Sequence, residues 1–389
     1  MEEAMHPFYP FAPRHARGDA RAIRSRGAQP RVVPGRQWCP GRTLLAMSHP
    51  LQSSAPAAEW IRSLPKAEVH VHLEGCVPAV TIGFDDPSRA GVALDPTTGA
   101  PSFSGLADFL DYLDRSCALV TEGDQLQSIA HALTERAARD GVLHTDVIFN
   151  PTHWPAWRDD LGTFVAHLDA GLAAGEADFG VTAALCLSLT RTQPPADSVA
   201  LVDWLLDARP ERIVALSVDG NEAAAGPTGE RFAPLFARAR TAGLRTCAHA
   251  GESSGPDGVR EAIELLGAER IDHGIRSVED PLLVATLART GVPLDVCPTS
   301  NVRLGVAPSI AAHPVERLRR AGVRVSVNTD DPLLFGTTMT AEYDVCAQSF
   351  DWDHGVLAQI ARTSIESCFA APERVSELLA LLDDALAPS

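Results

Sequence analysis

From Trp60 onward, the chain alternates short apolar runs with longer segments in which apolar residues recur every three or four positions. Short runs are typical of buried parallel strands, and the longer pattern is typical of amphipathic helices. Eight such units predict an α/β protein of the (β/α)8 TIM-barrel class. The predicted strands are 67–72, 143–150, 180–188, 213–219, 244–250, 270–273, 292–297 and 323–329. The predicted helices are 128–140, 161–174, 196–208, 230–242, 259–266, 281–289 and 315–321, followed by C-terminal helices at 356–369 and 373–386.

Two segments depart from this repeat. Residues 80–127 are punctuated by Pro and Gly and are partly helical. In a barrel this insertion follows strand one on the active-site side, where it can cover the site. Residues 1–46 hold eight Arg and lack apolar periodicity. We expect them to be a disordered, Arg-rich N-terminal extension, or chain upstream of a natural start at Met47. The predicted barrel domain spans residues 60–389.

Composition narrows the classes of partner. The formal net charge is −17, from 33 Lys plus Arg against 50 Asp plus Glu, which argues against nucleic acid or an anionic membrane as the main partner. No run of about 18 apolar residues exists, so we predict no membrane span. The eight cysteines are scattered without a C-x-x-C pair. This indicates a reducing compartment, and we expect a cytoplasmic protein.

Histidines stand at the ends of two predicted strands. Alternate residues of a strand share a face, so His70 and His72 should point together into the barrel mouth. His249 ends the fifth run, and Glu252 follows three residues later. Active sites of barrels lie at the carboxyl ends of the strands. This position therefore offers a metal ligand and a proton carrier, although a carboxylate beside a helix start would explain Glu252 as well.

Two more strand ends carry titratable groups. His273 ends the sixth run, and Asp330 and Asp331 end the eighth. Taken alone, His273 could be a structural histidine and the Asp pair a solvated turn. Two adjacent buried carboxylates would repel each other, and a metal beside Asp330 removes that objection.

Taken together, these strand ends predict one metal site. Three neutral imidazoles and one carboxylate are a ligand set that suits zinc, and we expect one Zn²⁺ per subunit. Zinc lowers the pKa of a bound water to about 7, so a nucleophile forms without a strong external base. His273 could orient that nucleophile, and Glu252 could carry a proton to the substrate and its leaving group. The predicted ligands are His70, His72, His249 and Asp330.

The motifs HVHLEG, HAGE, RIDHG, CPTSN and NTDDP occur in this order between residues 70 and 332. The chain from about residue 60 to 372 thereby resembles the adenosine/adenine deaminase family of the amidohydrolase superfamily. The resemblance implies a metal-dependent deaminase barrel with zinc on the four ligands named above. It also implies that Glu252 protonates purine N1, that His273 supports the attacking hydroxide and that Asp331 hydrogen-bonds N7. A backbone amide after strand four would bind N3, and here Gly220 fits that role.

The motifs leave the substrate open. Adenosine deaminases usually carry Asp at the position of Glu74, which can meet the ribose, and both Glu74 and RIDHG are similar to adenine deaminases. The segment 219–222, DGNE, looks more like the nucleoside branch. CPTSN and the FGT of residues 335–337 are similar to deaminases of aminodeoxyfutalosine, and residues 146–151 depart from the usual second strand. We expect a small-molecule partner, a 6-aminopurine or purine nucleoside bound by His72, Glu74, Gly220 and Asp331, and the sequence allows a homodimer.

Other classes fit less well. A two-zinc amidohydrolase usually needs a carboxylated Lys on the fourth strand, and residues 213–219 contain none. The zinc cytidine deaminases need a P-C-x-x-C motif, which this chain lacks. A non-catalytic purine-binding barrel predicts loss of a ligand or of Glu252, and all are present. A nucleic-acid protein that uses the Arg-rich start predicts salt-sensitive binding that depends on residues 1–46.

Overall fold

A computed structural model describes residues 56–78, 93–94 and 101–387. All of these belong to one compact unit, Gln52–Ser389. The predicted extension at residues 1–46 lies outside the described residues, as does much of the predicted insertion between residues 79 and 100.

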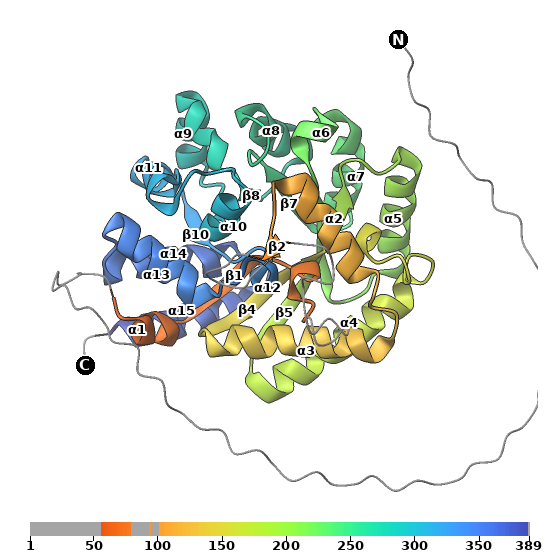
Figure 1. The fold of residues 1–389 in the computed structure, drawn as a ribbon, viewed down its shortest axis with the longest axis horizontal. Helices are drawn as coiled ribbons and strands as arrows, with labels where there is room; N and C mark the ends of the chain where they lie inside the picture. The colour runs from red at the N-terminus through yellow and green to blue at the C-terminus, as the bar shows by residue number, and fades with distance from the viewer. Residues whose placement is uncertain (1–55, 79–92, 95–100, 388–389) are drawn as a thin grey trace, which may run out of the picture. The chain divides into compact units, whose positions relative to one another are not determined.

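Eight parallel strands form the centre of this unit, in the order β1-β4-β5-β6-β7-β8-β9-β10 (Figure 1). A parallel bridge between Val71 and Asp330 joins the end of the last strand to the first and closes the barrel. The predicted (β/α)8 TIM barrel is confirmed. The strands are β1 Lys66–His72, β4 Val142–Phe149, β5 Thr182–Thr190, β6 Ile213–Asp219, β7 Arg245–Ala250, β8 Arg270–His273, β9 Leu294–Val296 and β10 Val325–Val327.

Helices surround the strands (Figure 1). The nine predicted helical segments are helical, within a few residues at each end. They are α3 Gly123–Arg139, α4 Leu161–Phe179, α5 Pro195–Ala208, α7 Gly229–Thr241, α8 Pro256–Glu261, α9 Pro281–Thr290, α11 Val315–Arg320, α14 His354–Ser367 and α15 Pro372–Leu386. The segment predicted at 259–266 is divided, because α8 passes into a π-helical turn at Ala262–Leu266.

The structure also contains helices that the periodicity does not predict. Short helices follow several strands at the site end: α6 Glu222–Ala225, α10 Pro298–Arg303 and α12 Pro332–Phe335. Helix α13 Met339–Phe350 is longer, and its buried face includes Tyr343, Cys346 and the carboxylate of Glu342. A polar residue on the buried face weakens the apolar period, which is why the pattern missed this helix.

Part of the predicted insertion forms helix α2, Leu106–Cys117, after a two-residue strand pair of β2 Ala93–Leu94 with β3 Pro101–Ser102. Phe103 and Phe109 pack with each other and with Phe335 of α12, with ring centroids 5.0 to 6.5 Å apart. The pairing of α2 with α12 places the insertion next to the residues that follow β10.

The barrel interior holds a small apolar cluster contributed by four neighbouring strands and by Phe369, which follows α14. Its members are Ile148, Cys186, Ala215, Cys247 and Phe369. The seven cysteines within the described residues are free and buried. No helix in the described part of the chain is long and apolar enough to cross a membrane.

Candidate metal and catalytic site

Four side chains that are distant in the sequence converge at the carboxyl end of the barrel. His70, His72, His249 and Asp330 each place a ligand atom within 4.8 Å of the others. The Nε2 atoms of His70 and His72 lie 3.3 and 3.4 Å from Asp330 Oδ1. The Nε2 atoms of His72 and His249 lie 3.0 Å apart. The structure therefore brings together the four predicted ligands.

The contacts within this group fit a metal cation. All four residues are largely buried, and His70 Nε2 has no hydrogen-bond partner. Nitrogen lone pairs that face one another in a buried site are costly unless a cation or a proton lies between them. Three imidazoles and one carboxylate form a donor set that suits zinc.

The end of the last strand explains why Asp330 joins the two histidines of β1. Asp330 donates its backbone N–H to the His70 carbonyl oxygen at 3.1 Å, and its own carbonyl accepts from His72 N–H at 2.8 Å. Its φ is +65°, a left-handed conformation that ends the strand and that Asp adopts more readily than most residues. Closure of the barrel thus fixes the carboxylate beside the imidazoles.

Glu252 lies on the turn that follows β7, and a second buried carboxylate holds that turn. Glu222 Oε2 accepts hydrogen bonds from the backbone N–H groups of Glu252 at 2.9 Å and Ser253 at 3.1 Å. Its Oε1 accepts from the N–H of Gly251 at 3.0 Å and from the hydroxyl of Ser254 at 2.9 Å. Because Glu222 belongs to the loop after β6, this carboxylate ties the loop of Gly220 to the loop of Glu252.

The surroundings of Glu252 favour its protonated form. Burial raises its pKa to about 8, and the negative charges of Asp330 and Glu222 act in the same direction. Its Oε1 lies 3.5 Å from His273 Nε2. A carboxyl group that keeps its proton near neutral pH can serve as a general acid.

His273 lies at the end of β8, and its side chain faces Glu252 and Asp330. Its Nε2 lies 3.9 Å from Asp330 Oδ2, and its Nδ1 contacts the side-chain amide of Asn301 at 3.2 Å. Its φ is +66°, so the backbone turns at this residue as it does at Asp330. Burial and the neighbouring imidazoles of His70 and His249 hold the pKa of His273 well below its usual range, so the ring is neutral.

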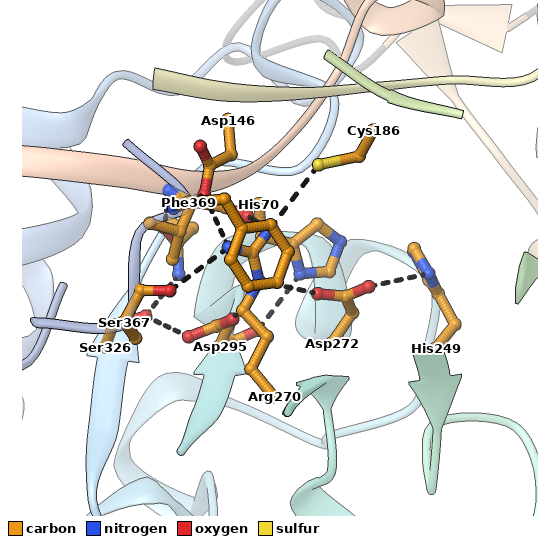
Figure 2. A network of polar contacts seen from close by, with 12 residues as sticks. His70, Asp146, Cys186, His249, Arg270, Asp272, Asp295, Ser326, Ser367 and Phe369 are labelled. Carbon is orange, nitrogen blue, oxygen red and sulfur yellow. Dashed lines mark hydrogen bonds and ion pairs between the residues drawn. The ribbon is translucent and has the colours of Figure 1, made fainter. Parts of the chain in front are cut away.

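A buried ionic network lies beside two of the predicted ligands, His70 and His249 (Figure 2). Arg270 contacts Asp146 Oδ2 at 2.5 Å and Asp295 Oδ2 at 3.1 Å, with Asp272 Oδ1 at 3.9 Å. Asp272 Oδ2 in turn lies 3.4 Å from Nδ1 of His249. A carboxylate at this position favours a proton on His249 Nδ1 and leaves the Nε2 lone pair for a metal.

The same network also contacts His70, another of the predicted ligands. The carbonyl oxygen of Asp295 lies 3.0 Å from His70 Nδ1, so a proton on that nitrogen is satisfied and Nε2 is again left for the site. Arg270 is fully buried and stacks on the ring of Phe369 at 3.9 Å, and it donates to the Val69 carbonyl at 2.8 Å. A guanidinium shared among these strands fixes the carboxylates that face the ligands.

We call His70, His72, His249 and Asp330 the metal group. Asp331 is buried beside it, and its Oδ1 has no hydrogen-bond partner. Burial and the charge of Asp330 raise its pKa well above the ordinary range. Gly75 makes room for it, because a Cβ on Gly75 would lie 2.2 Å from Asp331 Oδ1. The glycine of HVHLEG is therefore required by the close approach of the residue that follows Asp330.

Glu74 presents one free carboxylate oxygen to the site. Its Oε1 accepts from the Asn150 backbone N–H at 2.8 Å and from the Trp154 indole N–H at 2.7 Å. Its Oε2 accepts no hydrogen bond and lies 4.0 Å from His72 Nδ1, and burial raises the pKa of the side chain to about 7.

A cavity of about 40 Å³ lies over these groups. Its polar wall comes from the strand ends and includes Gly220, whose φ of +92° is a conformation that favours glycine. Its apolar wall comes largely from α2, so the described part of the insertion does cover the site, as predicted. The lining residues are His72, Glu74, Leu106, Phe109, Leu110, Leu113, His153, Asp219, Gly220, His249, Glu252, His273, Leu304, Asp330 and Asp331.

Every residue that the sequence assigned to the site lies in the metal group or lines this cavity, although the role of each stays a prediction. Sequence reasoning assigned no role to Glu222, Asp272 or Asn301. Asp272 and Asn301 belong to RIDHG and CPTSN, so those motifs already contained the signal. Glu222 follows Gly220 by two residues, and only the fold shows that its carboxylate meets the turn of Glu252.

Comparisons with known proteins agree with this geometry. Residues 65–385 match the family model described as adenosine deaminase. An adenine deaminase of Sphingopyxis alaskensis is 37% identical over 331 residues, covering 84% of this chain and 96% of the relative.

Two solved structures share the fold. The crystal structure of an adenine deaminase from Arthrobacter aurescens has a TM-score of 0.75 and 33% identity, and the match covers 82% of this chain and 98% of that one. A zinc-bound amidohydrolase from Burkholderia ambifaria has a TM-score of 0.74 and 27% identity, with 88% and 97% of the two chains covered.

Proposed function

This chain belongs to the adenosine deaminase family and is a deaminase of the amidohydrolase type, and we propose that it is a mononuclear zinc enzyme that converts adenine to its 6-oxopurine and ammonia. The convergence of three imidazoles and one carboxylate beneath a small cavity, beside a carboxyl group with a raised pKa, carries the proposal.

His70, His72, His249 and Asp330 would hold the ion. The zinc-bound neighbour of the same fold supports zinc as its identity. When bound, Zn²⁺ acts as a Lewis acid that lowers the pKa of a water to about 7. Asp272 and the Asp295 carbonyl orient two of the imidazoles, so the ligand set is arranged before the ion binds.

Glu252 carries the protons of the reaction. Attack of water on C6 moves electron density onto ring N1, and the protonated Glu252 carboxyl can neutralise that charge by donating to N1. The carboxylate formed in this step can take a proton from the attacking water and pass it to the departing amine, which leaves as ammonia. The C6 hydroxyl group then gives its remaining proton to Glu252 as the 6-oxo group forms, and this restores the acid. Glu222 holds the turn of Glu252 in place for both transfers.

Asp331 and Gly220 would orient the purine. Burial and the charge of Asp330 raise the pKa of Asp331, which favours the protonated carboxyl group that could donate to N7 of a neutral purine. Gly220 lines the same cavity, and its backbone amide would donate to N3. Two contacts on different ring nitrogens fix a planar base in one orientation.

Two features favour the free base over a nucleoside. The cavity is narrow and is walled by α2 on its apolar side, so it accommodates a planar base more readily than a base that carries a ribose. Glu74 lines that cavity and its Oε2 accepts no hydrogen bond, and only the free base carries a ring N9–H that could donate to it. Relatives of 36 and 37% identity named adenine deaminase support the same substrate.

Ammonia release from a purine panel tests the proposal. The panel contains adenine, adenosine, deoxyadenosine, methylthioadenosine, N6-substituted adenines and aminodeoxyfutalosine, with N6-substituted substrates followed by loss of their amine. We expect the highest kcat/KM for adenine. A preference for a nucleoside or for a substituted adenine would move the assignment to that substrate. If the zinc-bound protein released no ammonia or amine from any of these compounds, the result would instead indicate a non-catalytic purine-binding barrel.

Substitution of Glu74 with glutamine tests the substrate contact. The glutamine carbonyl would keep the two N–H donors of Asn150 and Trp154, which leaves an NH₂ group where the free acceptor was. We expect kcat/KM for adenine to fall by about 10–100-fold, the loss for one hydrogen bond to a charged group. Glu342→Gln is the matched control, because that buried carboxylate binds Thr299 and Thr337 outside the cavity. Equal losses in both variants would refute the contact.

A further inference from the structure

The ring nitrogens of a neutral histidine have opposite roles, and the partner of one decides what the other can do. At His273 that partner is Asn301 of α10, whose side-chain nitrogen lies 3.2 Å from Nδ1. An amide side chain could present either its NH₂ or its carbonyl to the ring. The contacts beyond Asn301 remove this ambiguity.

A backbone amide sets the direction of the whole chain of contacts. The backbone N–H of Val315 lies 3.2 Å from His313 Nδ1 and can only donate, so that nitrogen accepts. His313 Nε2 then carries the ring proton and donates to Asn301 Oδ1 at 3.0 Å. With its carbonyl occupied, Asn301 turns its NH₂ toward His273 Nδ1.

These contacts form a relay that runs from the Val315 amide through His313 and Asn301 to His273. The relay leaves one neutral tautomer for His273. Its Nδ1 is an acceptor, so its proton lies on Nε2, the nitrogen that faces Glu252 and Asp330 across 3.5 and 3.9 Å. All three side chains of the relay are at least 97% buried, so water does not compete for these contacts. We propose that Asn301 and His313 are positioning residues that fix His273 as a hydrogen-bond donor toward the reacting oxygen and prevent it from acting as the base.

This inference rests on the proposed deaminase function. It assigns charge stabilisation to His273 and proton transfer to Glu252. A donor at His273 Nε2 can stabilise negative charge that develops on the oxygen added at C6. It cannot accept the proton of the attacking water, because its only lone pair faces Asn301. That proton must go to a carboxylate, and Glu252 lies within 3.5 Å of His273.

Asn301→Asp is the sharpest test because it replaces the amide donor with an acceptor of nearly the same size and shape. The new carboxylate would accept from His313 Nε2 and would also demand a proton from His273 Nδ1, so His273 Nε2 would become a bare acceptor. Two N–H donors favour the ionised form of such a carboxylate. A catalytic imidazole in the wrong tautomer lowers kcat by up to about 10⁴-fold in hydrolases. We expect kcat to fall by about 10²–10⁴-fold on this basis, with zinc content unchanged and KM within about threefold.

His313→Gln and His313→Met form the matched pair. Glutamine keeps an N–H donor for Asn301 Oδ1, whereas methionine fills similar space without one. We expect the glutamine variant to keep kcat within about threefold and the methionine variant to lose about tenfold or more, because Asn301 can then turn its amide. If Asn301→Asp does not fold, this pair still tests the relay, and equal losses in the two variants would overturn it.

A measurement on the wild-type, zinc-loaded full chain separates the inference from the proposed function. Long-range ¹H–¹⁵N correlation spectra of ¹⁵N-histidine-labelled protein report which ring nitrogen carries the proton. We expect the proton of His273 on Nε2, with the signal assigned by its change in His273→Ala. A proton on Nδ1 would overturn the relay even in an active enzyme. An inactive protein with the Nε2–H tautomer would instead count against the deaminase proposal alone.

Discussion

Replacement of Asp330 with alanine is expected to remove most of the bound zinc and to lower kcat/KM for adenine by at least about 10³-fold. Asp330 Oδ1 is the atom that lies near both histidines of β1, at 3.3 and 3.4 Å. Its loss leaves three neutral nitrogens and no charge to compensate the dication. Zinc content measured by inductively coupled plasma mass spectrometry, after dialysis against a metal-free buffer, checks the result.

Asp331→Ala is the matched control for this substitution. Asp331 is the next residue and is also buried, but its side chain is not part of the metal group. We expect this variant to keep one equivalent of zinc while it loses activity, because the contact to N7 is gone. One equivalent of zinc in Asp330→Ala, or equal zinc loss in both variants, would contradict the assignment of the ligands.

The second large effect is expected for Glu252→Gln. The glutamine keeps the size of the side chain and cannot exchange a proton, so the path from the attacking water to N1 and the leaving amine is broken. We expect kcat to fall by about 10²–10⁴-fold, the contribution typical of a positioned general acid and base. Zinc content should stay at the wild-type value, because Glu252 is not among the four predicted ligands.

Glu261→Gln provides the comparison for Glu252→Gln. The Glu261 carboxylate accepts from the backbone N–H groups of Thr228 and Gly229, at 3.3 and 2.9 Å, and does not line the cavity. We expect near-normal turnover in this variant. Wild-type kcat in Glu252→Gln would rule out its role in proton transfer, and a loss of zinc would show that the substitution disturbs the metal site.

The sequence predicted the barrel and the ligand set for the same physical reason. Parallel strands all end at one face, so titratable residues at strand ends such as His70, His249 and Asp330 must meet there. The alternation of a strand adds His72 to His70, and the motif order supplies Glu252. These inferences can be made without measured distances, because the barrel fold itself brings the strand ends together.

The supporting contacts follow from packing that has no sequence period. Arg270 begins β8, and nothing in the sequence pattern indicates that it pairs with Asp146, 124 residues away. The relay from Val315 through His313 to Asn301 depends on a loop between two short helices. The barrel places the ligands, whereas these contacts choose their protonation states and orientations, which only coordinates reveal.

Zinc-edge anomalous diffraction from crystals of the full chain tests the central claim most directly. We expect one zinc peak, about 2.0–2.2 Å from the ligand atoms of His70, His72, His249 and Asp330. A peak held by other residues would contradict the account. So would a pair of ions about 3.5–4 Å apart, since that arrangement belongs to two-metal hydrolases.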